Sequence, residues 1–282
     1  MSPYLTDPKT ESIVPVVQGG KLTSGTNTVS FSCCGVRIAV EFDSRISTSN
    51  IRSVLPPEFR EFQGEETDHH FSLVGAGGTP HGEQMYRIRK GSTIAASPVS
   101  LGQAMVVLHK TVRHCVAEYT RDRAFVHAGV VAWKGRGIIC PGPSFAGKST
   151  LIRSMLNSGA TYYSDEYAVF DGNGHAHPFP VPICLRETDG RGQTIDADRI
   201  GAQPLSPSLI LFAQYRKDGS WQPGTLTPGQ TLLRLLENSV SMRRNPHTVL
   251  KVLKEVTVAA KAYAGERGEA DAIKDWLEGL AF

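Results

Sequence analysis

Eight consecutive residues near the middle of the chain could bind phosphate. Residues 142–149 read Gly-Pro-Ser-Phe-Ala-Gly-Lys-Ser and match the pattern G-x-x-x-x-G-K-[ST] at every fixed position. In that pattern, backbone N–H groups turn inward around an anion, the lysine reaches the β- and γ-phosphates, and the last hydroxyl can ligate Mg²⁺. We therefore expect ATP and Mg²⁺ as cofactors. The expected nucleotide-binding set is Gly142, Pro143, Ser144, Phe145, Ala146, Gly147, Lys148, Ser149 and Thr150.

Two adjacent acids, Asp165 and Glu166, follow the loop closely in the sequence. Phosphoryl transfer needs a metal-bridged triphosphate and a group that positions the attacking oxygen. One acid could hold Mg²⁺, directly or through water, while the other accepts a hydroxyl proton. The sequence leaves open which of the two is the base. The plain alternative is a strand that ends in solvated charges.

The surroundings of the acid pair disfavour a transporter or a mechanical ATPase. A Walker B acid ordinarily follows an apolar strand and comes much later in the chain, whereas here Thr-Tyr-Tyr-Ser directly precedes Asp165. The Leu-Ser-Gly-Gly-Gln signature of transport ATPases is also missing from the sequence.

The elements expected around these residues suit phosphate chemistry. The apolar run 137–140 predicts a strand before the loop, and residues 149–156 predict a helix after it, so the helix dipole would favour an anion in the loop. Residues 124–133 predict a strand that a turn at 134–137 joins to the strand before the loop. Further strands are expected around the acid pair and over 208–213.

The pattern of apolar and polar residues predicts a domain boundary near residue 98. Residues 1–98 predict a β-rich (α+β) module with a short helix over 50–55, a loop or hairpin tip over 75–80, and strands at 28–33, 36–42, 70–74, 84–89 and 93–96. Apolar residues recur every three or four positions over 101–119, which predicts an amphipathic helix. Residues 99–282 then form the loop-containing domain, with helices expected over 229–241, 246–263 and 269–280.

Composition narrows the classes of protein. The chain has 282 residues, of which 40% are hydrophobic and 20% charged, as is typical of a globular protein. A net charge of +3 without a Lys/Arg cluster gives no support for nucleic-acid binding. No signal-peptide pattern or membrane-spanning apolar stretch is present. We expect a cytoplasmic protein that binds neither nucleic acid nor membranes.

His127-Ala128-Gly129, the hairpin, the loop and the acid pair occur in an order that resembles the catalytic core of HPr kinase/phosphorylase. That family has a fold related to phosphoenolpyruvate carboxykinase. The likeness is closest to HPr-kinase-related proteins of bacterial biosynthetic clusters, including kinases that phosphorylate a peptide precursor. It implies an α/β fold: a P-loop kinase core of this type, with C-terminal helices, beside the small N-terminal module. The N-terminal module does not resemble that of the true HPr kinases.

The resemblance also implies roles for individual residues. His127 would stand near the γ-phosphate and organise the acid pair, while Asp165 and Glu166 take the positions of the family's paired aspartates. Glu187 would be a further metal-side acid and Arg186 a substrate contact, although the sequence around them departs from the glycine-rich signature of the bifunctional enzymes. Reverse phosphorylase activity is therefore not expected.

A second arginine pair, Arg243 and Arg244, carries a weaker likeness to the same relatives. These arginines could clamp a phosphate by bidentate hydrogen bonds. They could equally complement the dipole at the end of a helix.

The sequence thus predicts an ATP- and Mg²⁺-dependent kinase that acts on a hydroxyl, with a serine of a small protein or peptide as the preferred acceptor. The N-terminal module would recognise the acceptor or a partner. A homo-oligomer is conceivable because the true HPr kinases are hexamers. Two alternatives stay open: a phosphotransferase acting on a small metabolite, and a nucleotide-binding regulatory module without transfer activity.

Overall fold

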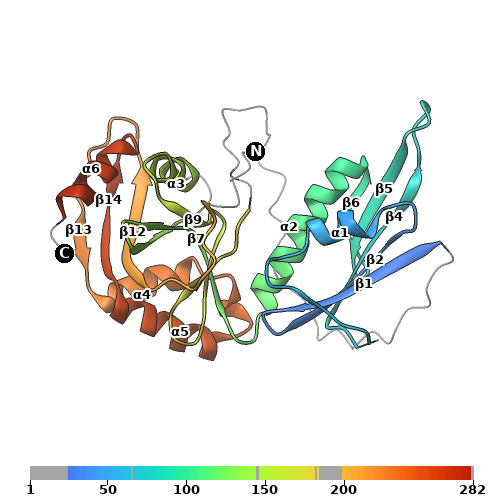
Figure 1. Cartoon of the computed structure of the whole chain (residues 1–282), viewed down its shortest axis with the longest axis horizontal. Helices are drawn as coiled ribbons and strands as arrows, with labels where there is room; N and C mark the ends of the chain where they lie inside the picture. The colour runs from blue at the N-terminus through green and yellow to red at the C-terminus, as the bar shows by residue number, and fades with distance from the viewer. Residues whose placement is uncertain (1–24, 65, 144–145, 182, 184–198, 281–282) are drawn as a thin grey trace. The chain divides into compact units, whose positions relative to one another are not determined.

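The computed structural model describes residues 25–64, 66–143, 146–181, 183 and 199–280. These residues form a mixed α/β protein with two mixed β-sheets and six α-helices (Figure 1). The chain divides into two compact units. Within the described residues, unit 1 comprises 25–31, 37–53 and 61–108, and unit 2 comprises 32–36, 54–60 and 109–280.

Unit 1 is built on a six-stranded sheet in the order β3-β1-β2-β4-β5-β6. β2 pairs with β4 in parallel, whereas β5 is antiparallel to both of its neighbours. The sequence of β2 alternates as a half-buried strand should, because Ile38, Val40 and Phe42 are fully buried while Arg37 and Glu41 are not. The elements are β1 (Thr26–Cys33), β2 (Val36–Asp43), α1 (Thr48–Ser53), β3 (Arg60–Glu61), β4 (His69–Gly78), β5 (Gln84–Lys90), β6 (Thr93–Val99) and α2 (Leu101–Tyr119).

The strands and the long helix expected in this part of the chain are confirmed. Residues 75–80 were expected to be a loop or a hairpin tip; β4 and β5 do form a hairpin there, but β4 extends to Gly78, so its turn begins later than expected. The short strand β3 was not expected. The division between the units falls within α2, after Leu108, and two short segments from earlier in the chain belong to unit 2.

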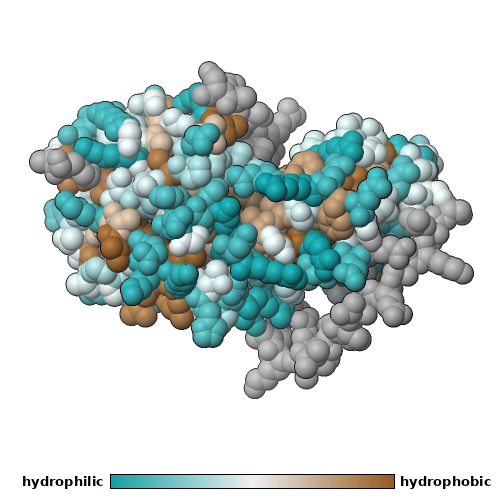
Figure 2. Space-filling model, turned by 60° about the horizontal axis from the view of Figure 1, so that its bottom comes forward, coloured by the Kyte–Doolittle hydropathy of each residue, from teal (hydrophilic) through white to brown (hydrophobic). Residues whose placement is uncertain are grey.

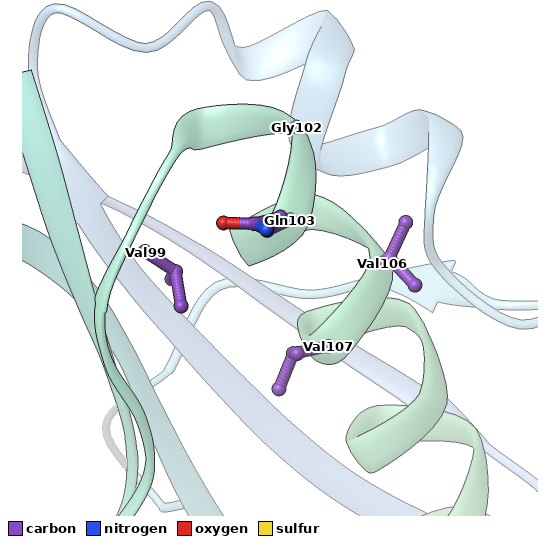
Figure 3. Close-up of a pocket in the computed structure, with 5 residues that line it drawn as sticks. All are labelled: Val99, Gly102, Gln103, Val106 and Val107. Carbon is purple, nitrogen blue, oxygen red and sulfur yellow. The ribbon is translucent and has the colours of Figure 1, made fainter. Parts of the chain in front are cut away.

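A shallow apolar groove lies beside the first turns of α2 in unit 1 (Figure 3). It has a volume of about 460 Å³ and is lined by Val99, Gly102, Gln103, Val106 and Val107. None of the residues expected to do chemistry lines it.

Unit 2 contains the loop between β8 and α3. Its elements are β7 (Ala124–Trp133), β8 (Arg136–Pro141), α3 (Lys148–Asn157), β9 (Thr161–Ser164), β10 (Tyr167–Phe170), β11 (Ala176–His177), β12 (Pro207–Tyr215), β13 (Gly224–Leu226), α4 (Pro228–Glu237), a 3₁₀ turn (Ser241–Arg243), α5 (Pro246–Ala259), β14 (Lys261–Arg267) and α6 (Asp271–Gly279).

The sheet of unit 2 has the order β11-β10-β7-β8-β12-β14-β13, with β9 also pairing with β7. β8 is parallel to β12 on one side and antiparallel to β7 on the other. Both faces are covered by helices: α3 and α6 pack on one face, and α4 and α5 on the other (Figure 1).

The side chains of β8 alternate between the two faces of the sheet and so contribute to both hydrophobic clusters. Ile138 and Cys140 belong to the cluster that contains α3 and α6, whereas Ile139 belongs to the cluster that contains α4 and α5. A strand covered on both faces has a nearly continuous apolar sequence, as residues 137–140 do. Packing on both faces of the sheet therefore fixes β8, and β8 fixes the point at which the loop begins.

Two C-terminal predictions were wrong in their extent. The helix expected over 246–263 ends at Ala259, and residues 261–267 form strand β14, parallel to β12. Ala260 already has an extended backbone, because the chain turns there to place β14 in the sheet. The helix expected over 229–241 ends at Glu237 and is followed by the short 3₁₀ turn.

On the face of unit 2 that Figure 2 shows, apolar side chains are scattered among polar ones. Leu233 on α4 and Leu250 and Val258 on α5 are the large apolar residues that these helices expose. In the described part of the chain, every helix is too short or too polar to cross a lipid bilayer.

Candidate functional site

The strand and the helix predicted on either side of the loop are both present. β8 ends at Pro141, and α3 begins at Lys148. Gly147 precedes the helix with a φ of +81°, a left-handed conformation that glycine adopts without strain. Within the described residues no side chain caps the N-terminus of α3. An uncapped helix start is the arrangement in which backbone N–H groups can bind an anion.

Lys148 lies across the described part of the loop. Its Nζ donates hydrogen bonds to the carbonyl oxygens of Gly142 and Pro143, both at 2.8 Å. Burial lowers the pKa of Lys148, and the negative charge of Asp165 opposes this effect. The ammonium group is thus held inside the loop by weak neutral acceptors that a phosphate could replace.

The backbone of β7 connects the loop to the acid pair. Gly142 N donates to the carbonyl oxygen of His127 at 3.1 Å, and Ala128 N donates to the carbonyl oxygen of Glu166 at 3.3 Å. His127 N in turn donates to Asn238 O at 2.8 Å. Two neighbouring residues of one strand therefore fix the start of the loop and the bend that carries the acids. The three motifs that the sequence singled out meet at one place.

Asp165 faces the start of α3. Its Oδ1 atom is buried and has no hydrogen-bond partner among the described residues. Burial raises the pKa of Asp165 to about 6, while the Ser149 hydroxyl and the charge of Lys148 act in the opposite direction. A buried carboxylate oxygen without a donor is costly, so its persistence indicates a site that a cation could complete.

The donor set fits Mg²⁺ only in part. The described residues contain no cluster of three or more His, Cys, Asp or Glu side chains that could hold a metal by themselves. Ser149 and Asp165 offer two oxygen ligands on one side. Mg²⁺ commonly takes one or two protein oxygens and completes its shell with water and substrate phosphates, so this sparse set suits a metal that arrives with a nucleotide.

Glu166 has a different environment from its neighbour. Burial raises its pKa, and the positive charges of Arg113 and Lys110 and the Tyr167 hydroxyl oppose the rise. Arg113 was not anticipated. It lies on α2, is only 6% exposed, and its Nε and Nη1 atoms have no hydrogen-bond partner among the described residues. Its guanidinium lies 4.8 Å from the centre of the Phe179 ring.

His127 is half-buried on β7, beside the aromatic ring of Tyr167, with 5.0 Å between ring centroids. Burial lowers the pKa of His127, and the positive charges of Lys148 and His114 lower it further. The imidazole is therefore neutral near pH 7, with one nitrogen able to donate and the other to accept.

Arg267, at the end of β14, is a second residue that the sequence did not reveal. It is 1% exposed, and its Nη2 donates to Gly147 O at 2.7 Å. A Cβ added to Gly147 would lie 2.5 Å from that same Nη2. Arg267 thus fixes the backbone of the loop at Gly147, directly before Lys148. It was missed because the sequence places the start of β14 in a helix.

The remaining predicted site residues divide into two groups. Arg243 and Arg244 are exposed, and no hydrogen bond or ion pair joins either to the described part of the loop. Arg244 instead donates to Tyr119 Oη at 2.9 Å and to Glu118 Oε1 at 3.4 Å. Ser144, Phe145, Arg186 and Glu187 lie outside the described residues.

Gly129 allows α3 to approach β7. A Cβ at this position would lie 2.5 Å from Ile152 Cγ1 on α3 and 3.8 Å from Asp165 Oδ1. We expect Gly129→Ala to lower the free energy of unfolding by roughly 1–3 kcal/mol through overpacking, measured by urea denaturation. Gly172→Ala is the matched control, because a Cβ there would meet nothing within 4 Å. Equal stability of the two variants would contradict the expected crowding.

The fold and the site together define an α/β protein in which a sequence of the G-x-x-x-x-G-K-[ST] pattern lies between a central strand and a helix. Compared with models of known protein families, the chain matches none. A search of curated proteins likewise finds no matching sequence. The functional assignment therefore rests on the residues and their geometry.

Proposed function

We propose that this chain is an ATP- and Mg²⁺-dependent kinase that transfers the γ-phosphate to a hydroxyl group, with a serine of a small protein or peptide as the preferred acceptor. We also propose that unit 2 is a P-loop kinase core of the HPr kinase/phosphoenolpyruvate carboxykinase type. The observation that carries the proposal is the double backbone link of β7, from His127 to the start of the loop and from Ala128 to Glu166. It supports a single site in which a triphosphate and an acid pair act together.

In this proposal Lys148 and the backbone of the loop hold the triphosphate. Ser149 would hold Mg²⁺ together with Asp165, whose Oδ1 has no hydrogen-bond partner among the described residues, and the metal would supply positive charge to the β- and γ-phosphates. We assign Glu166 as the base because Asp165 is assigned to the metal and because burial raises the pKa of Glu166, against the opposing charges of Arg113 and Lys110, which strengthens its carboxylate as a proton acceptor. The acceptor O–H loses its proton to that carboxylate, a bond forms between its oxygen and the γ-phosphorus, and the bond to the departing ADP oxygen breaks.

Unit 1 contributes none of the residues assigned to transfer. We propose that it recognises the acceptor or a partner.

The direct test is to incubate the full-length protein with γ-labelled ATP, Mg²⁺ and a cell lysate, with Asp165→Asn as the inactive control. We expect label on the serine of a small protein or peptide, detected by mass spectrometry, with the wild type alone. Label only on a low-molecular-weight compound would favour a metabolite kinase. Tight ATP binding without any transfer would favour a regulatory module.

His127 is expected to orient the acid pair rather than to bind nucleotide. We predict that His127→Asn lowers kcat by about 10²-fold and leaves KM for ATP nearly unchanged, because the backbone bonds of residue 127 persist. Steady-state kinetics of transfer measure both constants, and the exposed His247→Asn is the control. An unchanged kcat would mean that His127 only packs against its neighbours and takes no part in transfer.

A further inference from the structure

Tyr215 exposes an aromatic ring next to the phosphate loop. It is the last residue of β12, and 45% of it is exposed to solvent. Its backbone N donates to Ala146 O at 3.3 Å. A Cβ on Gly147 would lie 3.1 Å from Tyr215 Cβ. The side chain therefore begins in contact with the loop itself.

One side of this ring faces a fixed cation. The Cζ atom of Arg267 lies over the ring of Tyr215, 5.5 Å from its centroid. The guanidinium is held in place by Gly147 O at 2.7 Å and Gly268 O at 2.8 Å. Because Arg267 is buried and doubly bonded, it restrains both the loop and the aromatic side chain beside it. The exposed part of the ring stays available to a ligand.

The order of strands shows which part of a nucleotide could reach Tyr215. The acids lie in the bend between β9 and β10, and both strands pair with β7. β12, which carries Tyr215, lies on the other side of β8 from β7. A triphosphate whose γ-phosphate points to Asp165 would therefore direct its other end, with the sugar and the base, toward β12.

We propose that Tyr215 is the stacking platform for the nucleotide base, and that Arg267 positions it. The inference rests on the proposed function, since it requires a nucleotide in the loop. Aromatic side chains stack on any base face, so this contact would supply affinity for the nucleoside part without selecting one base by hydrogen bonding. A lone exposed tyrosine is ordinary on protein surfaces, but this one contacts the phosphate loop and is backed by the buried arginine that holds it.

The experiment compares two ligands that differ in the nucleoside. Isothermal titration of the full-length protein with Mg²⁺-ATP and with Mg²⁺-tripolyphosphate gives both dissociation constants. We expect Tyr215→Ala to weaken ATP binding about tenfold and to leave tripolyphosphate binding unchanged. Tyr215→Phe should bind both ligands as the wild type does, because the ring remains. Leu233→Ala is the control for loss of an exposed apolar side chain, at 64% exposure on α4.

Three results would overturn the inference. The first is unchanged ATP affinity in Tyr215→Ala, and the second is an equal loss for both ligands, which would mean that the loop itself was disturbed. The third is a wild type that binds tripolyphosphate as tightly as ATP. That result would mean that the protein binds the phosphates but gains no affinity from the nucleoside. A wild type that binds neither ligand would remove the proposed function as well.

Discussion

Replacing Lys148 by alanine should abolish phosphate transfer, with a fall in kcat/KM of at least about 10³-fold. The lysine Nζ is the cation that the structure holds within the described loop, through the carbonyl oxygens of Gly142 and Pro143. Phosphoryl transfer depends on positioning and on stabilising charge, so a missing cation beside the β- and γ-phosphates cannot be replaced by water. ATP binding should weaken in the same variant.

The loss should be chemical rather than structural. Removing Nζ takes one donor from two loop carbonyls, and a hydrogen bond contributes about 1 kcal/mol to stability. We therefore expect a small change in Tm beside the large loss of activity. Lys134→Ala is the matched control, because Lys134 is an exposed lysine paired with Glu278 at 3.5 Å, and exposed pairs contribute little. Transfer by Lys148→Ala at the wild-type rate would refute the proposed mechanism.

The loop could be predicted from sequence because its information is local. Strand, loop and helix occupy one continuous stretch, and each has its own signal: an apolar run, glycines, and a helical segment predicted over 149–156. The helix of the structure begins one residue earlier, at Lys148. The meeting of His127 with the loop was less accessible. The turn expected at 134–137 indicated that β7 pairs with β8, but the hydrogen bond from Gly142 to His127 depends on the register of that pairing, which the sequence does not specify.

Arg113 and Arg267 could not be found in this way, because each looks like a surface residue in the sequence. Arg113 follows Val112 on an amphipathic helix, where a charged side chain is ordinarily solvated, and only tertiary packing buries it. Arg267 ends a strand whose residues alternate poorly: several side chains of β14 are partly or fully exposed. The apolar period of α5 ran on past Ala259 in the sequence and concealed the strand.

Both arginines belong to the environment of the site rather than to a motif. Arg267 fixes the carbonyl oxygen of Gly147, and Arg113 supplies positive charge near Glu166. A motif records residues that touch the ligand, whereas these two act through the backbone or through charge. This is why sequence patterns pointed to the candidate site but not to the two arginines that surround it.

Asp165→Asn is expected to inactivate the protein and at the same time to stabilise it. Burial raises the pKa of Asp165 from 3.8 to about 6. The folded state therefore binds this proton more tightly than the unfolded state does. The favourable contribution is complete below about pH 4 and is lost as the pH rises through 6. Above pH 7 the ionised carboxylate costs the folded state about 3 kcal/mol, and the neutral amide of asparagine avoids that cost.

Thermal unfolding at two pH values tests the prediction. At pH 8 the Tm of Asp165→Asn should exceed that of the wild type, and at pH 4 the difference should largely vanish. Glu278→Gln, a change at an exposed acid, is the control and should shift Tm little at either pH. Mg²⁺-ATP should raise the Tm of the wild type, because a ligand that binds only the folded state stabilises it. EDTA should cancel much of that increase.

The same variant connects stability to chemistry. If the buried oxygen of Asp165 exists to meet Mg²⁺, its replacement should lower transfer by about 10³–10⁴-fold, and added Mg²⁺ should no longer increase the Tm reached with ATP. A carboxylate kept for structure alone would give the opposite pattern: lower stability at pH 8 with activity retained. We expect a gain in stability together with a loss of transfer if the Asp165 carboxylate serves function. Its burial lowers the stability of the folded state, and its contribution to transfer appears only when the ligand is bound.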